Sequence, residues 1–223
     1  MTQEKEPQVN GEPNGGESSF SGGPSDGARD RVIDAALRLA ETRSWSRLSL
    51  TEIAEEAGLS LADLHRHFAS KNEILESFFR SIDQATLAET ERARGGTRDR
   101  LFDVIMSRFD ALTPRREAIL GILNDWRSNP VQALSMLPGF WNSLAWMLEA
   151  AGAPAWGLKG LLLRKGLAVV YVNAFRAWID DDSPNLEKTM TALDAGLRYA
   201  ERVAGMTGFA HENTTAQDIP EPS

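Results

Sequence analysis

The sequence predicts an all-α fold of about nine helices, and three observations support this prediction. Apolar side chains recur at helical spacing, as they do in Val32, Ile33, Ala36, Leu37 and Ala40. Capping residues and prolines mark several helix starts. No segment shows sustained alternation of apolar and polar residues, and no hairpin signal stands between β-branched runs.

The composition is that of a soluble globular protein, with 223 residues of which 42% are hydrophobic and 25% charged. The chain has no cysteine, which excludes disulfides, thiolate metal sites and a cysteine nucleophile and fits a cytoplasmic location. Its first residues have no apolar core, so a secretory signal is not expected. The most apolar run, 158–179, is interrupted by Lys159, Arg164, Lys165 and Arg176, so a membrane span is not expected either.

The order of the chain predicts two functional parts between two tails. Residues 1–28 and 205–223 are rich in Gly, Ser, Pro and polar side chains, and we predict disordered tails there. Gly95-Gly96 breaks the helical pattern between the fourth and fifth helices. The predicted helices lie near 29–44, 50–57, 61–68, 71–94, 98–112, 115–127, 131–151, 155–180 and 184–204.

Prolines predict three helix starts in the second part of the chain. A potential capping residue precedes a proline at Thr113-Pro114, Asn129-Pro130 and Ser183-Pro184. Proline is favoured in the first turn of a helix because its missing N–H would have no partner there anyway. We therefore expect helices to begin at these three places.

Three capping boxes follow one another in the first part of the chain. In each, a serine precedes a carboxylate by three residues, so that each side chain can satisfy a free backbone N–H of the first turn. The pairs are Ser49 with Glu52, Ser60 with Asp63, and Ser70 with Glu73. Gly58 lies between the first two boxes and allows the left-handed turn that joins two helices at a steep angle.

The stretch LTEIAEEAGLSLADLHRHFASKNEIL resembles the DNA-binding region of TetR-family transcriptional regulators. The agreement includes Ile53-Ala54, Ala57 to Ser60, His67-Phe68 and Ser70-Lys71, and the specific resemblance covers residues 29–82. It implies a three-helix helix-turn-helix domain at 29–82 and a helical effector-binding and dimerisation domain at 83–204. It also implies a dimer that binds a double-stranded operator, usually as a repressor, and is released by a small apolar effector.

The resemblance identifies 61–68 as the recognition helix and Lys71 as a phosphate contact at the start of the next helix. His65 stands where the family usually has a tyrosine that contacts phosphate. The candidate DNA-binding residues are Arg47, Thr51, Ser60, Leu61, Ala62, Asp63, His65, Arg66, His67 and Lys71.

Asp63 has two interpretations. It can be occupied as the capping partner of Ser60, or it can face the DNA, where it would repel phosphate or accept a hydrogen bond from a cytosine amino group. Leu61 can contact a thymine methyl, or it can mark a surface that no longer serves DNA. The net charge of −8, with 8 basic and 9 acidic side chains in 29–80, argues against tight non-specific binding.

Five of the six tryptophans follow residue 120, in the part of the chain where the resemblance implies the effector pocket. Trp and Met suit an apolar or aromatic ligand, although each of these side chains can equally be core. The candidate pocket residues are Phe109, Trp126, Met136, Trp141, Trp146, Tyr171 and Phe175. The helix at 155–179 is apolar nearly all round and is expected to be buried. Helices within 155–204 are expected to pair with a second subunit in a four-helix bundle.

A second resemblance gives the alternative function. The segment LLLRKGLAVVYVNAFRAWIDDDSP resembles the lipid-binding accessory protein of ubiquinone biosynthesis, which has a TetR fold but is no repressor. Lipid or quinone binding with a vestigial DNA-binding domain is therefore the alternative, and a plain dimerisation module is a third possibility. The helix-turn-helix pattern is largely intact here, which favours the regulator.

An enzyme, a cofactor and a metal are not expected. Two of the three histidines, His65 and His67, lie in the helix-turn-helix and the third, His211, lies in the tail. The run 180–182 of three aspartates has no histidine nearby and is interpreted as a solvated helix end. The operator, the effector and the sign of regulation stay open.

Overall fold

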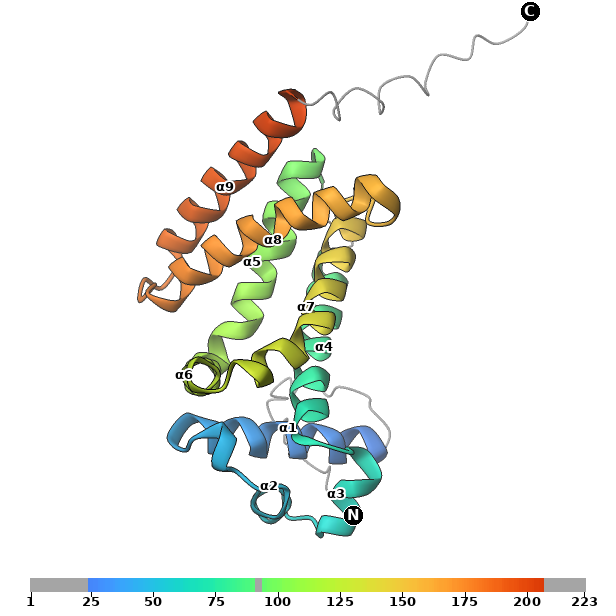
Figure 1. Cartoon of the computed structure of the whole chain (residues 1–223), viewed down its shortest axis with the longest axis vertical. Helices are drawn as coiled ribbons and strands as arrows, with labels where there is room; N and C mark the ends of the chain where they lie inside the picture. The colour runs from blue at the N-terminus through green and yellow to red at the C-terminus, as the bar shows by residue number, and fades with distance from the viewer. Residues whose placement is uncertain (1–23, 91–93, 207–223) are drawn as a thin grey trace, which may run out of the picture.

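The computed structural model describes residues 24–90 and 94–206, and within these residues it contains nine α-helices and no strand (Figure 1). This confirms the predicted fold class. The α-helices are α1 (Pro24–Thr42), α2 (Leu50–Glu56), α3 (Leu61–His67), α4 (Lys71–Thr90), α5 (Thr97–Leu112), α6 (Arg116–Ser128), α7 (Pro130–Ala150), α8 (Gly157–Ile179) and α9 (Glu187–Met206). Two 3-10 helices, η1 (Trp45–Arg47) and η2 (Thr113–Arg115), precede α2 and α6.

Helices α1, α2 and α3 pack around a small core at one end of the molecule, remote from α9 (Figure 1). The capping box at Ser49 is complete, because its hydroxyl accepts from the Glu52 amide and the Glu52 carboxylate accepts from the Ser49 amide. Gly58 has a φ of +68°, the left-handed conformation that turns the chain from α2 into α3. Leu64 and Phe68 of the following segment are buried in this core.

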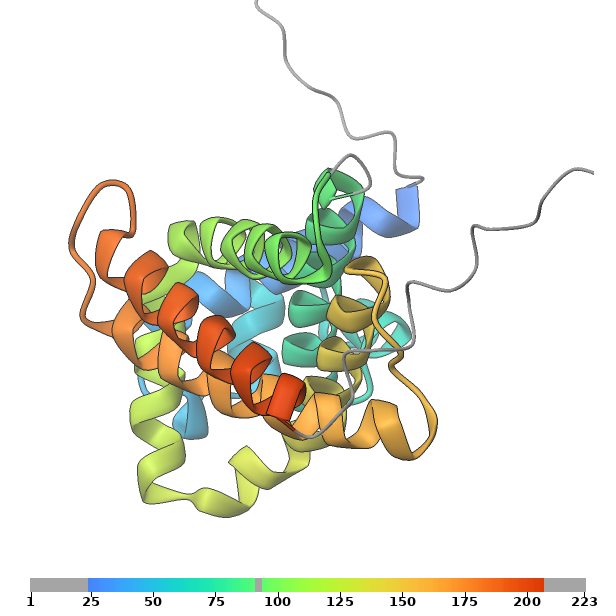
Figure 2. The ribbon, with the colours of Figure 1, turned by 90° about the horizontal axis from the view of Figure 1, so that it is seen from above.

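The C-terminal helices form the larger part of the molecule, and α8 and α9 lie side by side at one of its sides (Figures 1 and 2). Helix α7 contains Pro138, which has no N–H to donate to the preceding turn. The first part of α7 runs at a steep angle to the rest of the helix (Figure 1). Pro138 and Gly139 line a cavity of the C-terminal part.

Helix α6 joins the two parts of the molecule. Its Gly121 lies so close to α1 that a Cβ atom would come within 2.5 Å of the Ala40 carbonyl oxygen. One turn later, Asp125 accepts hydrogen bonds from the Ser44 hydroxyl at 2.8 Å and the Ser46 amide at 2.8 Å. These contacts fix α6 against the segment between α1 and α2.

Several predicted boundaries need correction. Helix α1 begins at Pro24, so the predicted tail at 1–28 is wrong for residues 24–28, and residues 1–23 lie outside the described residues. Helix α9 continues to Met206, and the rest of the predicted C-terminal tail lies outside the described residues. Residues 91–93, near the end of the predicted helix 71–94, also lie outside the described residues. The start at Pro130 is confirmed.

The other two proline signals do not begin an α-helix. Pro114 lies in η2, and α6 follows at Arg116. Helix α9 begins three residues after Pro184, because the Ser183 hydroxyl accepts from the Glu187 amide and caps the helix there.

The interpretation of the aspartate run as solvated is wrong for Asp181, which is buried. Its carboxylate accepts from the amide and hydroxyl of Ser183 and from the amide and hydroxyl of Thr189. Burial alone would raise the pKa of Asp181, but these four hydrogen bonds hold it well below its usual range. Asp181 therefore fixes the turn between α8 and α9.

The apolar sequence of α8 predicted a helix that is buried all round, and this prediction is wrong. Tyr171 and Trp178 point into the core, whereas Leu158, Val169 and Val172 are exposed. The helix packs mainly on α7 and α9, which leaves part of its surface uncovered. Within the part of the chain that the structure describes, no helix is long and apolar enough to cross a membrane.

The approach of α6 to α1 predicts a steric effect at Gly121. Gly121→Ala places its methyl group against the Ala40 carbonyl oxygen, so we expect a loss of about 1–3 kcal/mol in the free energy of unfolding, measured by urea denaturation. Gly139→Ala in α7 is the control, because its Cβ would meet no atom within 4 Å. Equal effects of the two substitutions would contradict the close packing of α6 on α1.

Candidate nucleic-acid interface and ligand cavity

Helix α3 presents one face to the core and another to solvent. Leu64 is fully buried, whereas Leu61, Ala62, His65 and Arg66 are exposed. The hydroxyl of Ser60 accepts from the Asp63 amide at 3.1 Å and caps the helix. The sequence had predicted these four exposed side chains as DNA contacts, and the fold leaves them accessible.

Asp63 makes the contacts that its capping interpretation predicts. Its carboxylate accepts from the Ser60 hydroxyl at 2.7 Å and forms an ion pair with Arg66. The Ser60 hydrogen bond and then the charge of Arg66 lower the pKa of Asp63, so the group is ionised. Because both of its partners lie on α3 or its cap, the negative charge of Asp63 is locally compensated.

Lys71 differs from its prediction as a phosphate contact. Its ammonium donates to the carbonyl oxygens of Trp45 at 2.9 Å, Ser46 at 3.3 Å and Leu48 at 2.6 Å, which uses all three of its donors. It also lies 5.5 Å from the centre of the Trp45 ring. Partial burial lowers the pKa of Lys71. The side chain therefore fixes the segment between α1 and α2 to the start of α4.

Arg29 fixes the other end of the helix-turn-helix. It donates to the His67 carbonyl oxygen at 2.6 Å and to the Ser77 hydroxyl at 2.9 Å. Its guanidinium lies 4.4 Å from the centre of the Phe68 ring. Arg29 thus joins α1, the end of α3 and α4, a role that the sequence did not reveal because all three contacts are long-range.

The third capping box is rearranged. The hydroxyl of Ser70 accepts from the Glu73 amide at 3.2 Å, as predicted. The Glu73 carboxylate accepts from the amide of Ala69 at 2.7 Å, one residue before the predicted donor. The start of α4 is capped in either arrangement.

The basic side chains near α2 are mostly engaged with acidic ones. Arg43 pairs with Glu52, and Arg38 pairs with Glu56 at 3.2 Å. Arg47 and Thr51 are exposed and have no side-chain hydrogen bond among the described residues. Exposed ion pairs contribute only about 0–1 kcal/mol, so Arg43 and Arg66 can exchange their carboxylate partners for phosphates.

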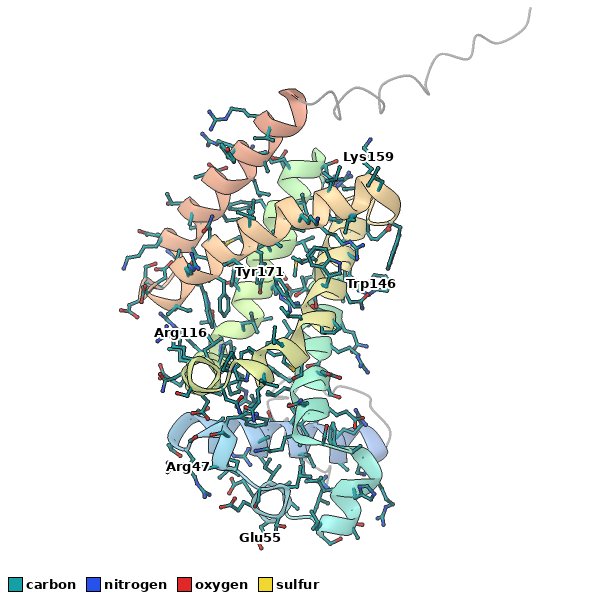
Figure 3. The ribbon with its side chains drawn as sticks, viewed as in Figure 1. Arg47, Glu55, Arg116, Trp146, Lys159 and Tyr171 are labelled. Carbon is teal, nitrogen blue, oxygen red and sulfur yellow. The ribbon has the colours of Figure 1, made fainter. Side chains whose placement is uncertain are left out.

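The C-terminal part contains a cavity of about 810 Å³ between α4, α5, α6, α7 and α8. Its walls are largely apolar and include Phe78, Phe79, Leu87, Ile119, Ile122, Leu123, Trp126, Met136, Leu137, Phe140, Trp146, Val172 and Phe175. The volume lies within the range of small-molecule sites. Trp146 and Leu137 are half-exposed and mark the open side, whereas Tyr171 lies inside the bundle (Figure 3).

Of the seven predicted pocket residues, five line this cavity: Trp126, Met136, Trp146, Tyr171 and Phe175. The prediction is wrong for Phe109, which is fully buried behind Tyr171 with their ring centres 5.4 Å apart. It is also wrong for Trp141, whose ring stacks 5.2 Å from the Arg164 guanidinium. Five residues apart on a helix, Trp141 and Trp146 point in different directions.

The sequence missed the polar side chains at the inner end of the cavity. Arg108 forms an ion pair with Asp83, which also accepts from the Ser143 hydroxyl at 2.5 Å. The Arg108 Nε atom donates to the Tyr171 hydroxyl at 3.1 Å. These residues come from α4, α5, α7 and α8, so the sequence shows no local motif for them. Among the described residues, no group of three or more His, Cys, Asp or Glu is placed to hold a metal.

Comparison with known proteins identifies the N-terminal domain. Residues 32–78 match the family described as bacterial regulatory proteins, tetR family. The HTH-type transcriptional activator FasR of Mycolicibacterium smegmatis is 25% identical over 194 residues, covering 84% of this chain and 88% of that protein. The HTH-type transcriptional regulator BetI of Agrobacterium fabrum is 32% identical over 96 residues, which is 40% of this chain. The nucleoid occlusion factor SlmA of Vibrio campbellii is 26% identical over 108 residues, which is 47% of this chain. The chain spans 46% and 55% of the lengths of these last two relatives.

Solved structures extend the likeness to the C-terminal part. A TetR transcriptional regulator from Nitrosomonas europaea has a TM-score of 0.64 and 25% identity, covering 78% of this chain and 98% of that one. FadR from Bacillus subtilis, solved in complex with stearoyl-CoA, has a TM-score of 0.55 and 19% identity, covering 75% of this chain and 97% of that one. The second of these likenesses concerns the fold alone.

The fold, the helix-turn-helix and these relatives define a class of protein, the helical bacterial transcriptional regulators. The helix-turn-helix domain of this chain, at residues 32–78, belongs to the TetR family, and the chain as a whole is similar to TetR-family regulators. The predicted resemblance is thereby confirmed, and the alternative of a lipid-binding accessory protein is not favoured by relatives that are HTH-type regulators.

The contacts of Lys71 predict a structural effect. Lys71→Met keeps the apolar stem beside Trp45 but removes three donors to carbonyl oxygens, so we expect a loss of about 1–3 kcal/mol in the free energy of unfolding. Arg47→Met, at an exposed position, is the control and should leave stability unchanged. If Lys71→Met keeps full stability and instead lowers the salt dependence of DNA binding, Lys71 is a phosphate contact after all.

The capping box at Ser49 predicts a pH dependence of stability. The backbone hydrogen bond from Ser49 and the Arg43 side chain lower the pKa of Glu52 from 4.5 to about 2. A depressed carboxyl pKa contributes stability above the unfolded-state pKa, and this contribution is lost as the pH falls toward the folded-state pKa.

Glu52→Gln should therefore be less stable than the wild type at pH 7, and the difference should shrink as the pH falls from 4.5 toward about 2. Urea denaturation at several pH values measures it. Glu55→Gln is the control, because Glu55 is exposed on the same helix (Figure 3). A difference for Glu52→Gln that does not change with pH would contradict the role of its charge.

Proposed function

We propose that this protein binds a double-stranded DNA operator as a homodimer and regulates transcription, and that a small apolar effector controls its binding. The observation that carries this proposal is the combination, in a TetR-family chain, of an exposed α3 with a large apolar cavity in the same molecule. Leu61, Ala62, His65 and Arg66 would contact DNA, together with Arg47 and Thr51. Leu61 and Ala62 suit thymine methyl groups, whereas Arg66 suits phosphate or guanine.

The exposed apolar side chains of α8 and α9 support the homodimer. Leu158, Val169, Tyr199 and Val203 are between 43% and 77% exposed in the single chain. Large apolar side chains exposed on two adjacent helices are typical of a surface that is covered in the assembled protein. A two-fold dimer through this surface presents two copies of α3, which suits a palindromic operator.

Helix α6 supports control by an effector. Its Ile119, Ile122 and Trp126 line the cavity, while Gly121 and Asp125 contact the DNA-binding part. A ligand that shifts α6 therefore also moves the segment between α1 and α2, and with it α3. Such control requires that the ligand binds one position of α6 better than another.

The relatives bear on the effector and the sign of regulation. FadR from Bacillus subtilis has been solved with stearoyl-CoA, and a cavity of about 810 Å³ with a half-exposed Trp146 at its open side can accept an apolar chain. FasR is an activator, so the sign of regulation is a separate question from the fold. We propose repression as the basal activity, with release of DNA on effector binding.

DNA binding is tested with a labelled duplex from the protein's own upstream region and a scrambled duplex of equal length. Fluorescence anisotropy at two salt concentrations should show at least about a tenfold preference for the natural duplex, with affinity falling as salt rises. A double variant, His65→Ala with Arg66→Ala, should lose the preference while keeping the helical content. Binding that is absent at low salt, or equal for the two duplexes, would reject the regulator.

A further inference from the structure

The Tyr171 hydroxyl, at the inner end of the cavity, is a hydrogen-bond donor without an acceptor among the described residues. The Tyr171 hydroxyl oxygen accepts from the Arg108 Nε atom at 3.1 Å, so its own hydrogen must point elsewhere. Among the described residues, this hydrogen has no acceptor. Tyr171 is only 6% exposed and lines the cavity. Its free hydrogen therefore calls for an acceptor inside the cavity.

The charged groups next to Tyr171 already neutralise each other. Asp83 and Arg108 form an ion pair, and the second oxygen of Asp83 accepts from the Ser143 hydroxyl at 2.5 Å. A carboxylate ligand would add an uncompensated negative charge to this buried group, and an ammonium ligand would find Asp83 already occupied. An uncharged acceptor oxygen satisfies Tyr171 without changing the charge balance.

The walls around Tyr171 are aromatic. Its ring centre lies 5.5 Å from that of Phe140 and 6.1 Å from that of Phe175, both of which line the cavity. These rings hold the Tyr171 side chain in place and leave its hydroxyl as a neutral donor at the inner end of the cavity. Most of the remaining lining is apolar and includes Ile122, Phe79 and Trp126, which favours an apolar body for the ligand.

We infer that the effector is an uncharged, apolar carbonyl compound whose oxygen accepts a hydrogen bond from the Tyr171 hydroxyl. This inference rests on the proposed effector site and adds the chemical class of the effector. Tyr171 acts as the specificity-determining residue, and the Asp83–Arg108 pair orients its hydroxyl through the Arg108 Nε atom.

Four bicyclic probes of similar shape test the inference. They are 2-acetylnaphthalene, its oxygen-free analogue 2-isopropylnaphthalene, the anion 2-naphthoate and the cation 2-naphthylmethylammonium. Calorimetric titration of the full-length protein should give the ketone about tenfold higher affinity than the oxygen-free analogue, as one buried hydrogen bond provides. The two charged probes should bind more weakly than the ketone.

Tyr171→Phe should remove the advantage of the ketone and leave the affinity of the oxygen-free analogue nearly unchanged. Tyr199→Phe is the matched control, because Tyr199 is the other tyrosine of the chain and is 65% exposed. It should keep the full advantage. An advantage that persists in Tyr171→Phe would overturn the assignment.

A measurement on the wild type keeps the inference testable if Tyr171→Phe does not fold. The infrared carbonyl stretch of bound 2-acetylnaphthalene should lie below its value in an apolar solvent, and an unshifted stretch would overturn the inference. Equal binding of the ketone and its oxygen-free analogue would overturn the inference alone, and so would tighter binding of either charged probe. If none of the four probes binds, both this inference and the proposed effector site are rejected. DNA binding is tested by the separate duplex experiment.

Discussion

The packing of α6 between the cavity and α1 is the constraint on which the rest of the molecule depends. Gly121 allows α6 to reach the Ala40 carbonyl oxygen, and Asp125 holds Ser44 and Ser46. The opposite side of the same helix supplies Ile119, Ile122 and Trp126 to the cavity. A larger side chain at position 121 would push α6 away from α1, and glycine at this position allows the two helices to touch.

Two basic side chains, Lys71 and Arg29, stabilise the N-terminal helices that α6 packs against. Lys71 binds three carbonyl oxygens around η1, and Arg29 binds the end of α3 and the start of α4. Both positive charges are therefore used within the fold. The chain as a whole is acidic, with a net charge of −8, and Arg43 and Arg66 in the helix-turn-helix part are paired with carboxylates. Under the proposed function, sequence selectivity would come from short-range contacts of α3 more than from the overall charge.

The cavity combines largely apolar walls with one ion pair, between Asp83 and Arg108. Burying Asp83 and Arg108 is unfavourable unless their charges and hydrogen bonds are matched, and Ser143 and Tyr171 provide the matching partners. The four residues also connect α4, α5, α7 and α8 at the depth of the cavity. A ligand hydrogen-bonded to Tyr171 would contact a group of side chains that comes from these four helices. The ligand would thereby be linked to α4, and also to α6, which lines the same cavity.

The sequence by itself determined the helices, the helix-turn-helix and the family. Periodic apolar residues and the Ser49, Ser60 and Ser70 caps act within a few residues of each other, so their effects are visible in the linear order. Five of the seven predicted pocket residues line the cavity, because large apolar side chains are concentrated in the helices around it. The same local logic failed for Pro184, where Ser183 caps α9 three residues later than the proline signal suggested.

Only the tertiary structure decided which of the candidate side chains are exposed, which line the cavity and which stabilise the fold. Lys71 and Arg29 find their carbonyl partners 23 to 38 residues away, and Phe109 is buried by Tyr171, which lies on a helix distant in sequence. The polar group in the cavity gathers one residue from each of four helices. Hydrogen bonds and burial depend on where the helices meet in space, and no local pattern of residues encodes those meeting points.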